Sequence, residues 1–422
     1  MYQGSDRHVP LQEREIKKMS ILYGDGIHDD YPAIQEMLDC GGEVILPDPE
    51  SGYTISQTLV IPSECRLTLP PFALIRLMDG MNCPMIRNRW NTERGHASHS
   101  VFKGPLWNYC RTVSVLRKDR CRDFEIRGGV WDFNNMNQKP NPIRTGDFGG
   151  HYTGFGMQFF NASRFKISAL TLKDPVTYGM NFDLSSDFEV SDIVFDYNHG
   201  NPAPINMDGI HLNGNCSGAV LRNLSGACYD DTVALNAAEG ISGPITHVTV
   251  DGISAEGSHS AVRLLVVDET ISDIEIANVR GSFYQYCVGF TKYYDKKDSR
   301  GRIERVVVRN ADVLKCQRVE GYPFPDPFVF PVFFFQSGVT VENVSFSSIT
   351  RRESAVPADT FLIEDGARVD GLSLICVSDE GAETNPGVLL SGGRNVSNLN
   401  TREVLLHGLP VNTHSLMEGY TT

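Results

Sequence analysis

The stretch DFEVSDIVF (187–195) decides the fold, because close variants of it return along most of the chain. Apolar residues alternate with polar ones, and Asp, Asn or Gly interrupts the alternation near the middle of many copies. Other copies are RFKISALTL (164–172), HVTVDGISA (247–255), DIEIANVRG (273–281), RVVVRNADV (305–313) and VTVENVSF (339–346). Alternation with a period of two predicts strands, and return at intervals of 23 to 41 residues predicts a solenoid of stacked turns.

A β-propeller is the main alternative to this solenoid. Its blades need about 40 residues and about four strands each, whereas the copies here leave room for only two or three short strands. The sequence therefore predicts an all-β fold, a single-stranded right-handed parallel β-helix over residues 21–405. Residues 1–20 are predicted to form an N-terminal extension and residues 406–422 a C-terminal tail.

One helix is predicted near the start of the chain, over residues 29–40. Asp29 or Asp30 can cap its N-terminus, Pro32 suits its first turn, and Gly41 can end it. The apolar stripe of this helix consists of Ile34, Met37 and Leu38. We expect the helix to cap the N-terminal end of the solenoid.

Composition limits the partners and the compartment. The net charge of −14 argues against nucleic acid and anionic membrane surfaces, because both require clustered Lys or Arg. The longest apolar run, FVFPVFFF (328–335), is too short to span a bilayer. The polar N-terminus lacks the apolar core of a signal peptide. The sequence thus predicts a cytoplasmic protein if this start is native, and a secreted one if a signal peptide was removed.

The ten cysteines show no metal-binding spacing. Most stand in apolar or strand-like contexts and are expected to be free, buried thiols, which favours a reducing compartment.

Two adjacent carboxylates, Asp230 and Asp231, stand at the start of a predicted strand in GACYDDTVALNA (226–237), although strands are poor in Asp. Turns of a β-helix stack about 4.8 Å apart, so residues one repeat apart become neighbours. Asp208 precedes Asp230 by 22 residues, and His259 follows Asp231 by 28. The four side chains are predicted to gather on one wall.

Three neighbouring carboxylates repel one another, and this repulsion raises the pKa of at least one of them. One carboxyl can then stay protonated near neutral pH while the others are ionised, as acid–base hydrolysis of a glycosidic bond requires. An isolated Asp-Asp pair is more often a turn feature. The catalytic interpretation also needs a bend at Gly209 and before Thr232, because strict alternation would point Asp208 and Asp231 into the core.

Several stretches resemble known families. YGDGIHDDYPAIQEMLDCGGEVILP (23–47) resembles the entry segment of β-helix proteins of the pectate-lyase superfamily. NMDG (206–209), YDD (229–231) and GSHS (257–260) resemble three successive motifs of glycoside hydrolase family 28, the polygalacturonases and rhamnogalacturonases. The resemblance implies a β-helix that hydrolyses a glycosidic bond with inversion.

The same resemblance assigns roles to the four residues. Asp230 would be the general acid, Asp208 and Asp231 would together activate the water, and His259 would orient or tune the acid. Such an arrangement needs the acid and the base carboxyl groups about 6.5–9.5 Å apart.

The chain departs from the family pattern at several positions. Tyr229 replaces a Gly, and serines flank His259. GFTK (289–292) stands in place of Arg-Ile-Lys, so Lys292 matches the motif while Phe290 replaces its Arg. Arg263 is a candidate replacement for that charge, and His211 stands where many members carry an acid. The predicted substrate-binding residues are Lys292, Arg263, His211, Tyr229 and Asn206.

The sequence thus predicts an inverting hydrolase of a pectin-type or related oligo- or polysaccharide, with no metal or other cofactor. Exo-action on short oligosaccharides is favoured if the protein is cytoplasmic. A uronate lyase or epimerase, with a base such as His259 or Lys292, and a non-catalytic, tailspike-like carbohydrate-binding β-helix remain alternatives. The aromatic segment 322–335 is predicted to cover the cleft, to pack in the core or to join subunits of a homo-oligomer.

Overall fold

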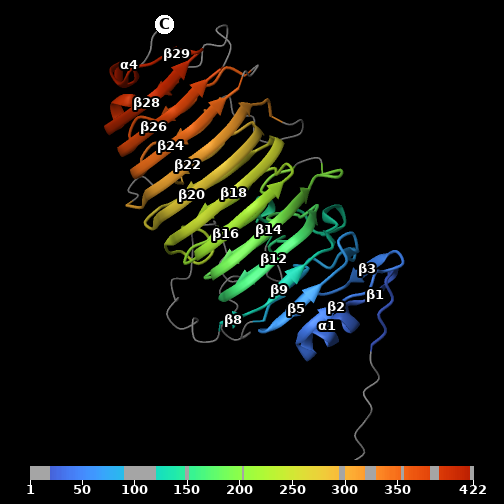
Figure 1. Cartoon of the computed structure of the whole chain (residues 1–422). Helices are drawn as coiled ribbons and strands as arrows, with labels where there is room; N and C mark the ends of the chain where they lie inside the picture. Colours follow the sequence, from blue (N-terminus) through green and yellow to red (C-terminus); the bar gives the residue numbers. More distant parts are fainter. Residues whose placement is uncertain are drawn as a thin grey trace, which may run out of the picture.

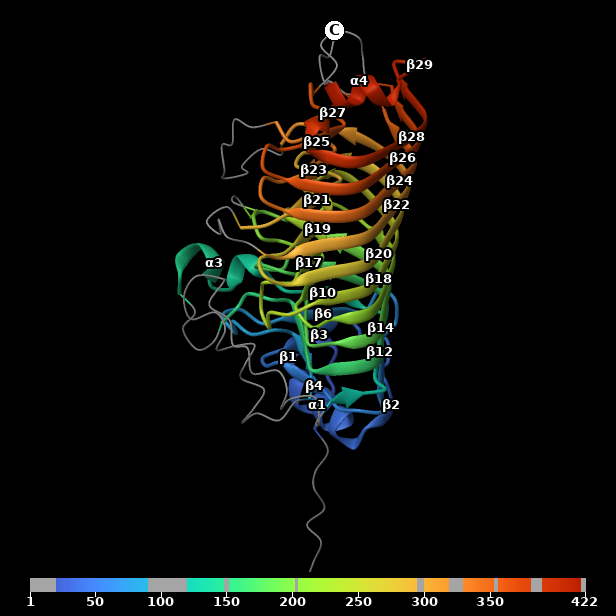
Figure 2. The same cartoon turned by 90° about the vertical axis from the view of Figure 1, so that its left-hand side faces the viewer.

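The computed structural model describes residues 20–89, 120–147, 152–201, 204–293, 300–318, 329–352, 356–380 and 389–418. The chain forms a right-handed parallel β-helix, as predicted, whose turns stack into one elongated body (Figures 1 and 2). Of the strand pairings within the described ranges, the antiparallel one joins β28 and β29, and the others are parallel.

The larger of the two sheets, called the long sheet here, is built mainly from the repeated phrase of the sequence. Its long strands are β12 (Ala162–Lys173), β14 (Ser186–Asp196), β16 (Ser217–Ser225), β18 (Ile245–Ser258), β20 (Thr270–Phe283), β22 (Arg302–Lys315), β24 (Thr340–Arg351), β26 (Arg368–Asp379) and β28 (Val396–Leu406). Its shorter strands are β1 (Asp25–Asp29), β2 (Gly42–Ile45), β3 (Gly52–Ile55), β5 (Cys65–Thr68), β6 (Leu74–Leu77), β8 (Cys121–Arg122), β9 (Glu125–Arg127), β10 (Val130–Asp132) and β29 (Leu409–Pro410).

The second sheet, called the short sheet here, forms another wall of the solenoid (Figure 2). Its strands are β4 (Leu59–Ile61), β7 (Ile86–Asn88), β11 (Met157–Phe160), β13 (Met180–Asp183), β15 (Ile210–Asn213), β17 (Asp231–Asn236), β19 (Ser260–Leu265), β21 (Val288–Thr291), β23 (Phe333–Phe335), β25 (Phe361–Ile363) and β27 (Leu390–Ser391). Each pairs in parallel with the strand of the next turn.

The polar interruption in each repeat is a corner of the long strands. Asn223, Asn278 and Asn310 have positive φ values of 53°, 57° and 55°. Asn tolerates this left-handed conformation better than most residues with a side chain. Asn310 also donates a hydrogen bond of 3.2 Å to Asn278 on the preceding turn. The corner residues therefore both bend the strands and link successive turns.

The core is a column of apolar side chains that stack from turn to turn. The rings of Phe124, Phe165 and Phe188 follow one another at 4.7 Å between centroids, close to the spacing of parallel strands. Nearer the C-terminus, Phe290 stacks on Phe335 at 4.4 Å. Alternation in the sequence thus becomes an apolar interior with one layer of side chains a turn.

The aromatic segment 322–335 is only partly within the described residues, because residues 319–328 lie outside them. Phe333 and Phe335 belong to the core, while Phe330 and Phe334 pack together with Tyr286. The described part of the segment is therefore packed within this chain. A homo-oligomer formed through the segment stays a prediction.

Helix α1 (Tyr31–Cys40) lies at the N-terminal end of the stack (Figure 1) and begins two residues later than the predicted start. Asp30 stands at the N-cap, but its carboxylate accepts hydrogen bonds from the backbone of Tyr23, Gly24 and Thr54 and does not cap the helix. Asp29 accepts one from Tyr31 N at 3.1 Å. The two aspartates thus hold the helix to the first turns of the solenoid.

At the C-terminal end, the predicted tail contains β29 and α4 (Thr413–Glu418). Leu416 of α4 is buried in the core, so residues 406–418 are part of the solenoid's end.

No helix in the described ranges is long and apolar enough to span a membrane. Nine cysteines lie in these ranges; none of them is in a disulfide, and Cys65, Cys121, Cys216, Cys228 and Cys287 are buried.

Candidate active site

The predicted catalytic residues sit where three successive strands of the short sheet begin. Ile210 of β15 pairs with Val233 of β17, and Asp231 of β17 pairs with Ser260 of β19. Asp208 stands two residues before β15, Asp230 directly precedes β17, and His259 directly precedes β19. Parallel pairing therefore brings the four side chains to one corner, on consecutive turns.

The chain shifts the phase of its alternation at this corner, as the catalytic interpretation required. Ala261 and Val262 are consecutive in sequence, and both belong to the core. Thr232 is also buried, with its hydroxyl 3.4 Å from that of Ser258, and the next residue, Val233, is in the core. A regular strand cannot point two consecutive side chains the same way. The shift leaves Asp231 on the outer side.

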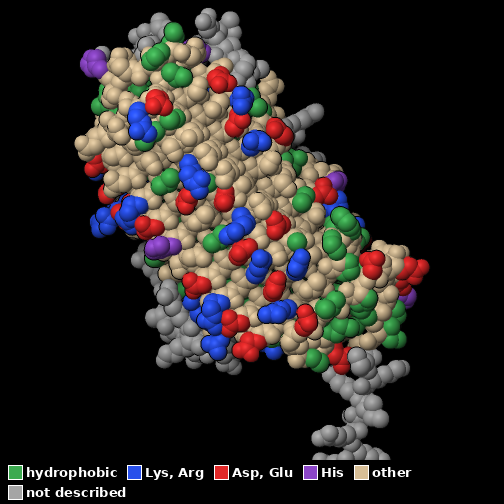
Figure 3. Space-filling view, in the orientation of Figure 1, with side chains coloured by type: hydrophobic (Ala, Val, Ile, Leu, Met, Phe, Trp, Pro, Cys, Tyr) green, Lys and Arg blue, Asp and Glu red, His purple; other side chains and the backbone are tan. Residues whose placement is uncertain are grey.

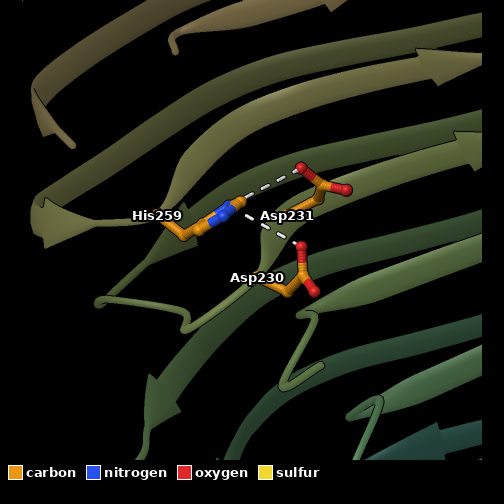
Figure 4. Close-up of side chains that lie close together, drawn as sticks. All are labelled: Asp230, Asp231 and His259. Carbon is orange, nitrogen blue, oxygen red and sulfur yellow. Dashed lines mark ion pairs between the residues drawn. The ribbon is translucent and has the colours of Figure 1, made fainter. Parts of the chain in front are cut away.

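Asp230, Asp231 and His259 form a compact group (Figure 4). The Nδ1 atom of His259 is 3.6 Å from Oδ1 of Asp230 and 4.0 Å from Oδ1 of Asp231. The hydroxyl of Ser260 donates a short hydrogen bond to Asp231 Oδ1 and lies 2.9 Å from Nδ1 of His259. Ser260 thus bridges the imidazole and one carboxylate.

Arg263 supplies a positive charge next to this group. Its Nη1 lies 3.9 Å from Oδ2 of Asp231, and its Nε donates to the hydroxyl of Thr291 at 3.0 Å. The side chains of Arg263 and Asp230 are 26% and 19% exposed, whereas that of Asp231 is 1% exposed. A substrate can therefore reach Asp230 and Arg263, while Asp231 stands behind them.

Burial sets the protonation of this group. Burial and the nearby Asp230 carboxylate raise the pKa of Asp231 to about 6. Burial also raises the pKa of Asp230, and the Arg263 guanidinium opposes that rise. Burial and the cations around it lower the pKa of His259 to about 4. Near pH 6 the group thus contains a neutral imidazole and carboxyls that can hold a proton.

A second histidine links Asp208 to a residue that the sequence did not suggest. His211 Nδ1 is 2.7 Å from Oδ2 of Asp208, and its Nε2 is 3.0 Å from Oε2 of Glu239. The ring of Tyr178 stacks on His211 at 3.9 Å between centroids. Burial favours the neutral ring, but the two carboxylates prevail and raise the pKa of His211 to about 10.

Glu239 reaches this position because the chain after β17 folds back over the outer face of the short sheet. Residues 237–241 are all buried, and the backbone N–H of Ile241 donates to Asp183 of β13 at 2.9 Å. The spacing of 28 residues between Asp231 and His259 does not reveal in which direction this segment runs. One feature of the sequence could have indicated the role of Glu239: it is a single acidic residue among small apolar residues, and a buried carboxylate needs a partner.

The remaining predicted residues have different surroundings. Asn206 donates to Oδ2 of Asp230 at 3.3 Å, so it belongs to the site. Tyr229 is half-buried and packs against the core. Lys292 follows the last residue of β21, at the opposite end of the strand from the carboxylates, and its backbone N–H donates to the Gln336 side chain. Phe290, in the same motif, is a core residue. The structure therefore brings Arg263, His211 and Asn206 to the carboxylates, but not Lys292.

The described residues between β10 and β11, 133–147 and 152–156, form a wall beside the site. Helix α3 (Pro142–Thr145) stands out from the solenoid in Figure 2. Asn141, at its N-cap, donates to Oδ1 of Asn206 at 3.1 Å, and Ile143 packs against Phe155 and Tyr178. A cavity of about 340 Å³ adjoins this segment and is lined in part by Asn141. The wall is thus joined to Asp230 through two hydrogen bonds.

Among the described residues, Asp230, Asp231 and His259 are the group whose donor atoms lie close enough to share a metal ion, within 4.8 Å of one another. The atoms they would offer are already used, because Ser260 contacts both Asp231 Oδ1 and His259 Nδ1. Arg263 adds a cation 3.9 Å from Asp231. A second cation would be repelled there, so these residues fit a metal poorly.

Comparisons with known proteins support the fold. No protein-family model matches the chain, and no curated protein matches its sequence. Among solved structures, an endo-xylogalacturonan hydrolase from Aspergillus tubingensis is similar with a TM-score of 0.59 and 16% identity, over 90% of this chain and 97% of that one. An exopolygalacturonase from Thermotoga maritima is similar with a TM-score of 0.56 and 14% identity, over 92% and 90%.

The A-module of the mannuronan C-5 epimerase AlgE4 from Azotobacter vinelandii is also similar, with a TM-score of 0.51 and 14% identity over 91% of this chain and 93% of that one. Identities this low show a shared right-handed β-helix and leave the activity to be argued from the site.

Proposed function

We propose that this chain is a glycoside hydrolase that cleaves a glycosidic bond in an oligo- or polysaccharide, with Asp230 as the general acid. One observation carries the proposal: consecutive turns place a partly exposed carboxyl, Asp230, beside two buried carboxyls and a cation at a single corner. A general acid must reach the leaving oxygen and hold a proton near neutral pH. Asp230 meets the first condition by its exposure, and burial shifts its pKa upward, in the direction that the second condition requires.

The other residues complete the proposed reaction. Asp230 gives its proton to the oxygen of the leaving sugar, and a water takes the place of that sugar at the anomeric carbon. Asp208 and Asp231 accept the proton of this water. Asp208 Oδ1 is buried and accepts no hydrogen bond from the described residues, so it has a lone pair for this water. Asn206 and His259 hold Asp230 in place.

The spacing of the carboxyls bears on the stereochemistry. The nearest oxygens of Asp230 and Asp231 are within 4.8 Å, which is shorter than the separation of about 6.5–9.5 Å between acid and base in inverting enzymes. Inversion therefore depends on Asp208, one turn away, to hold the water. Retention would instead require Asp231 to act as a nucleophile. Proton NMR of the first product's anomeric carbon distinguishes the two, and we expect inversion.

The substrate class rests on the neighbours and on Arg263. Two of the similar structures are hydrolases of galacturonan-type polysaccharides by name. The exposed part of the Arg263 guanidinium suits a carboxylate on the bound sugar, which a net charge of −14 would otherwise repel. A screen of galacturonides, rhamnogalacturonan fragments and neutral oligosaccharides, with reducing ends measured, should identify the substrate.

The test of the acid is Asp230→Asn. Losing a general acid typically slows the chemical step about 10²–10⁴-fold, so we expect kcat to fall by that factor on the natural substrate. Aryl glycosides whose leaving group departs without a proton should be cleaved by the variant at nearly the wild-type rate. The same substitution at the exposed Asp273 on the long sheet is the matched control. Equal loss on both substrates, or full activity on the natural one, would refute the assignment.

A uronate epimerase or lyase is the second candidate, favoured by the similarity to the C-5 epimerase. Either enzyme removes the proton at C5 of a uronate. An epimerase returns a proton from solvent, so its product formed in D2O carries deuterium at C5, whereas a lyase expels the C4 substituent and leaves a C4–C5 double bond that absorbs in the ultraviolet. Hydrolysis produces reducing ends without either signal. Measuring all three on the same digest separates the candidates.

A further inference from the structure

Two histidines stand at this site, and the structure gives them opposite roles. His259, which the resemblance made the partner of the acid, lies 2.9 Å from the Ser260 hydroxyl and 3.6 and 4.0 Å from the carboxylates of Asp230 and Asp231. Burial, together with Arg263 and other cations, nevertheless lowers the pKa of His259 to about 4. His211 lies between two carboxylates, Asp208 and Glu239, and its side chain is 1% exposed. Opposite charges within a few ångströms favour the charged form of an imidazole. His211 is therefore the charged histidine of the site.

Glu239 is the residue that makes this arrangement possible. Its Oε1 accepts a short hydrogen bond from the hydroxyl of Tyr293, and its other oxygen faces His211. These contacts lower the pKa of Glu239 to about 2, although burial opposes the charge. A carboxylate held ionised on one side of an imidazole raises the affinity of the ring for a proton. The proton shared with Asp208 is thereby drawn toward His211.

Asp208 requires a positive charge beside it to stay ionised. It is buried, and Asp230 lies near it, and both effects raise its pKa. A protonated Asp208 could not accept the proton of a water. The hydrogen bond to His211 is the contact that opposes protonation. The same single proton can sit on Asp208 Oδ2 or on His211 Nδ1, and its position decides whether a base exists.

We propose that Glu239 and His211 are a positioning pair that holds this proton on His211, so that Asp208 stays ionised as the base while Asp230 carries the proton of the acid. The inference rests on the proposed function and deepens it. Neither residue needs to touch the substrate; both act through Asp208. Tyr178 stacks on the ring and restricts its rotation, with Nδ1 in hydrogen-bond contact with Asp208 and Nε2 3.0 Å from Glu239.

Other charged and titratable groups also act on His211 from the surrounding turns. Asp183 from β13 adds negative charge when it is ionised. Asp230 before β17 is neutral when it carries the proton of the acid and adds no charge then, and Arg263 from β19 acts on Glu239. The acidic groups outnumber the cation, and their sum favours the charged ring. The groups that face the pair are Asp208, Glu239, Asp183, Asp230, Arg263, Tyr178 and Tyr293.

The test is to observe the protonation of His211 directly. Histidine labelled with 13C and 15N gives ring signals that differ between neutral and charged forms, and His211→Asn identifies the signal. In the full-length wild-type protein we expect His211 to stay charged from pH 6 through pH 8. A signal that titrates near the ordinary value of about 6.5 would overturn the proposal. This measurement needs no substrate and no folded variant other than the assignment control.

Glu239→Gln tests the consequence for the reaction. Removing one adjacent charge should lower the midpoint of the His211 titration by about 1–3 pH units. The ionised fraction of Asp208 should fall with it, so kcat should drop about 10- to 1,000-fold, with a much smaller change in KM. Glu239→Asp, which keeps the charge, should recover part of this loss.

Glu275→Gln is the matched control, since Glu275 pairs with Arg309 on the long sheet at 2.6 Å and stands far from the site. It should leave kcat and the His211 signal unchanged. If Glu239→Gln leaves both unchanged as well, the positioning pair is refuted while the role of Asp230 stands. If Asp230→Asn keeps full activity, the proposed hydrolysis fails, yet the charged state of His211 can still be read.

Discussion

Carboxylates on the outer faces of the two sheets have pKa values that are shifted in opposite directions. On the long sheet, Asp273 receives two hydrogen bonds from Arg305, at 2.6 and 2.9 Å, and these lower its pKa. Figure 3 shows other acidic and basic side chains mixed across this face. On the short sheet, Asp231 also has an arginine nearby, yet burial raises its pKa to about 6.

The two pKa shifts have different main causes: burial raises the pKa of Asp231, whereas direct hydrogen bonds from Arg305 lower that of Asp273. All six residues of β17 are buried, because the chain after it covers the outer face of the short sheet. A carboxylate that loses its water favours the neutral form, and Arg263, 3.9 Å from Asp231 with no hydrogen bond between them, does not compensate. Asp273 keeps its water and gains two hydrogen bonds. The same repeat therefore gives the long sheet an outer face with solvated, ionised carboxylates and the short sheet an outer face with buried carboxyls whose pKa is raised.

The largest effect that this comparison predicts is on catalysis. Asp208→Asn removes the proposed base and should lower kcat about 10²–10⁴-fold, the usual contribution of a general base. Asp273→Asn makes the same chemical change on the solvated face and should leave kcat unaltered. Steady-state kinetics on the substrate found in the screen, with circular dichroism to check folding, would measure both.

The contrast between the two sheets would be refuted if Asp208→Asn and Asp273→Asn had the same effect on kcat. Full activity in Asp208→Asn would mean that Asp231 alone serves as the base. Loss of activity in Asp273→Asn would mean that the long sheet takes part in the reaction.

A smaller effect is predicted for the free energy of unfolding, and here a substitution at the site should be stabilising. The pKa of Asp231 is about 6 in the folded chain and about 3.9 in an unfolded one. The folded state thus binds more protons between these values, so stability falls as the pH rises from 4 to 6 and stays lower above. Asp231→Asn removes this fall and should raise stability at pH 7 by up to about 3 kcal/mol, while it lowers activity.

Thermal unfolding at pH 4.5 and pH 7 checks this prediction. The wild-type protein should lose more stability between the two pH values than the Asp231→Asn variant does. A variant that is less stable than the wild type at pH 7 would show that the hydrogen bond from Ser260 outweighs the cost of burying the charge.

The sequence predicted the features that depend on a regular repeat. Stacked turns follow from the copies of one phrase, and the polar residue that interrupts many copies, such as Asn223, Asn278 or Asn310, has a positive φ in the structure and forms a corner. Equal spacing from turn to turn also brought Asp208, Asp230 and His259 together. Each of these inferences needs only that one turn lies above the next.

The features that the sequence missed depend on departures from the repeat. Glu239 reaches His211 because a loop folds back, and a spacing rule cannot foresee its direction. Lys292 matched a motif by distance along the chain, but the register places Thr291 opposite Leu265, at the far end of the strands. The neutral state of His259 and the charge of His211 depend on burial and neighbours, which one sequence does not reveal.

The smallest effect is expected for the ion pair that opened the comparison. Arg305 and Asp273 have good geometry, but their side chains are 49% and 31% exposed. Exposed pairs contribute little, because water and salt screen them and both side chains lose freedom. Arg305→Gln should therefore leave kcat/KM unchanged and shift Tm by no more than about 2 °C. Adding salt to the wild-type protein should change the Tm equally little.

The stability that Asp273 does contribute is present at neutral pH and lost in acid, the reverse of Asp231. A large loss of stability in Arg305→Gln would mean that the long sheet also excludes water, and burial would then no longer separate the two faces.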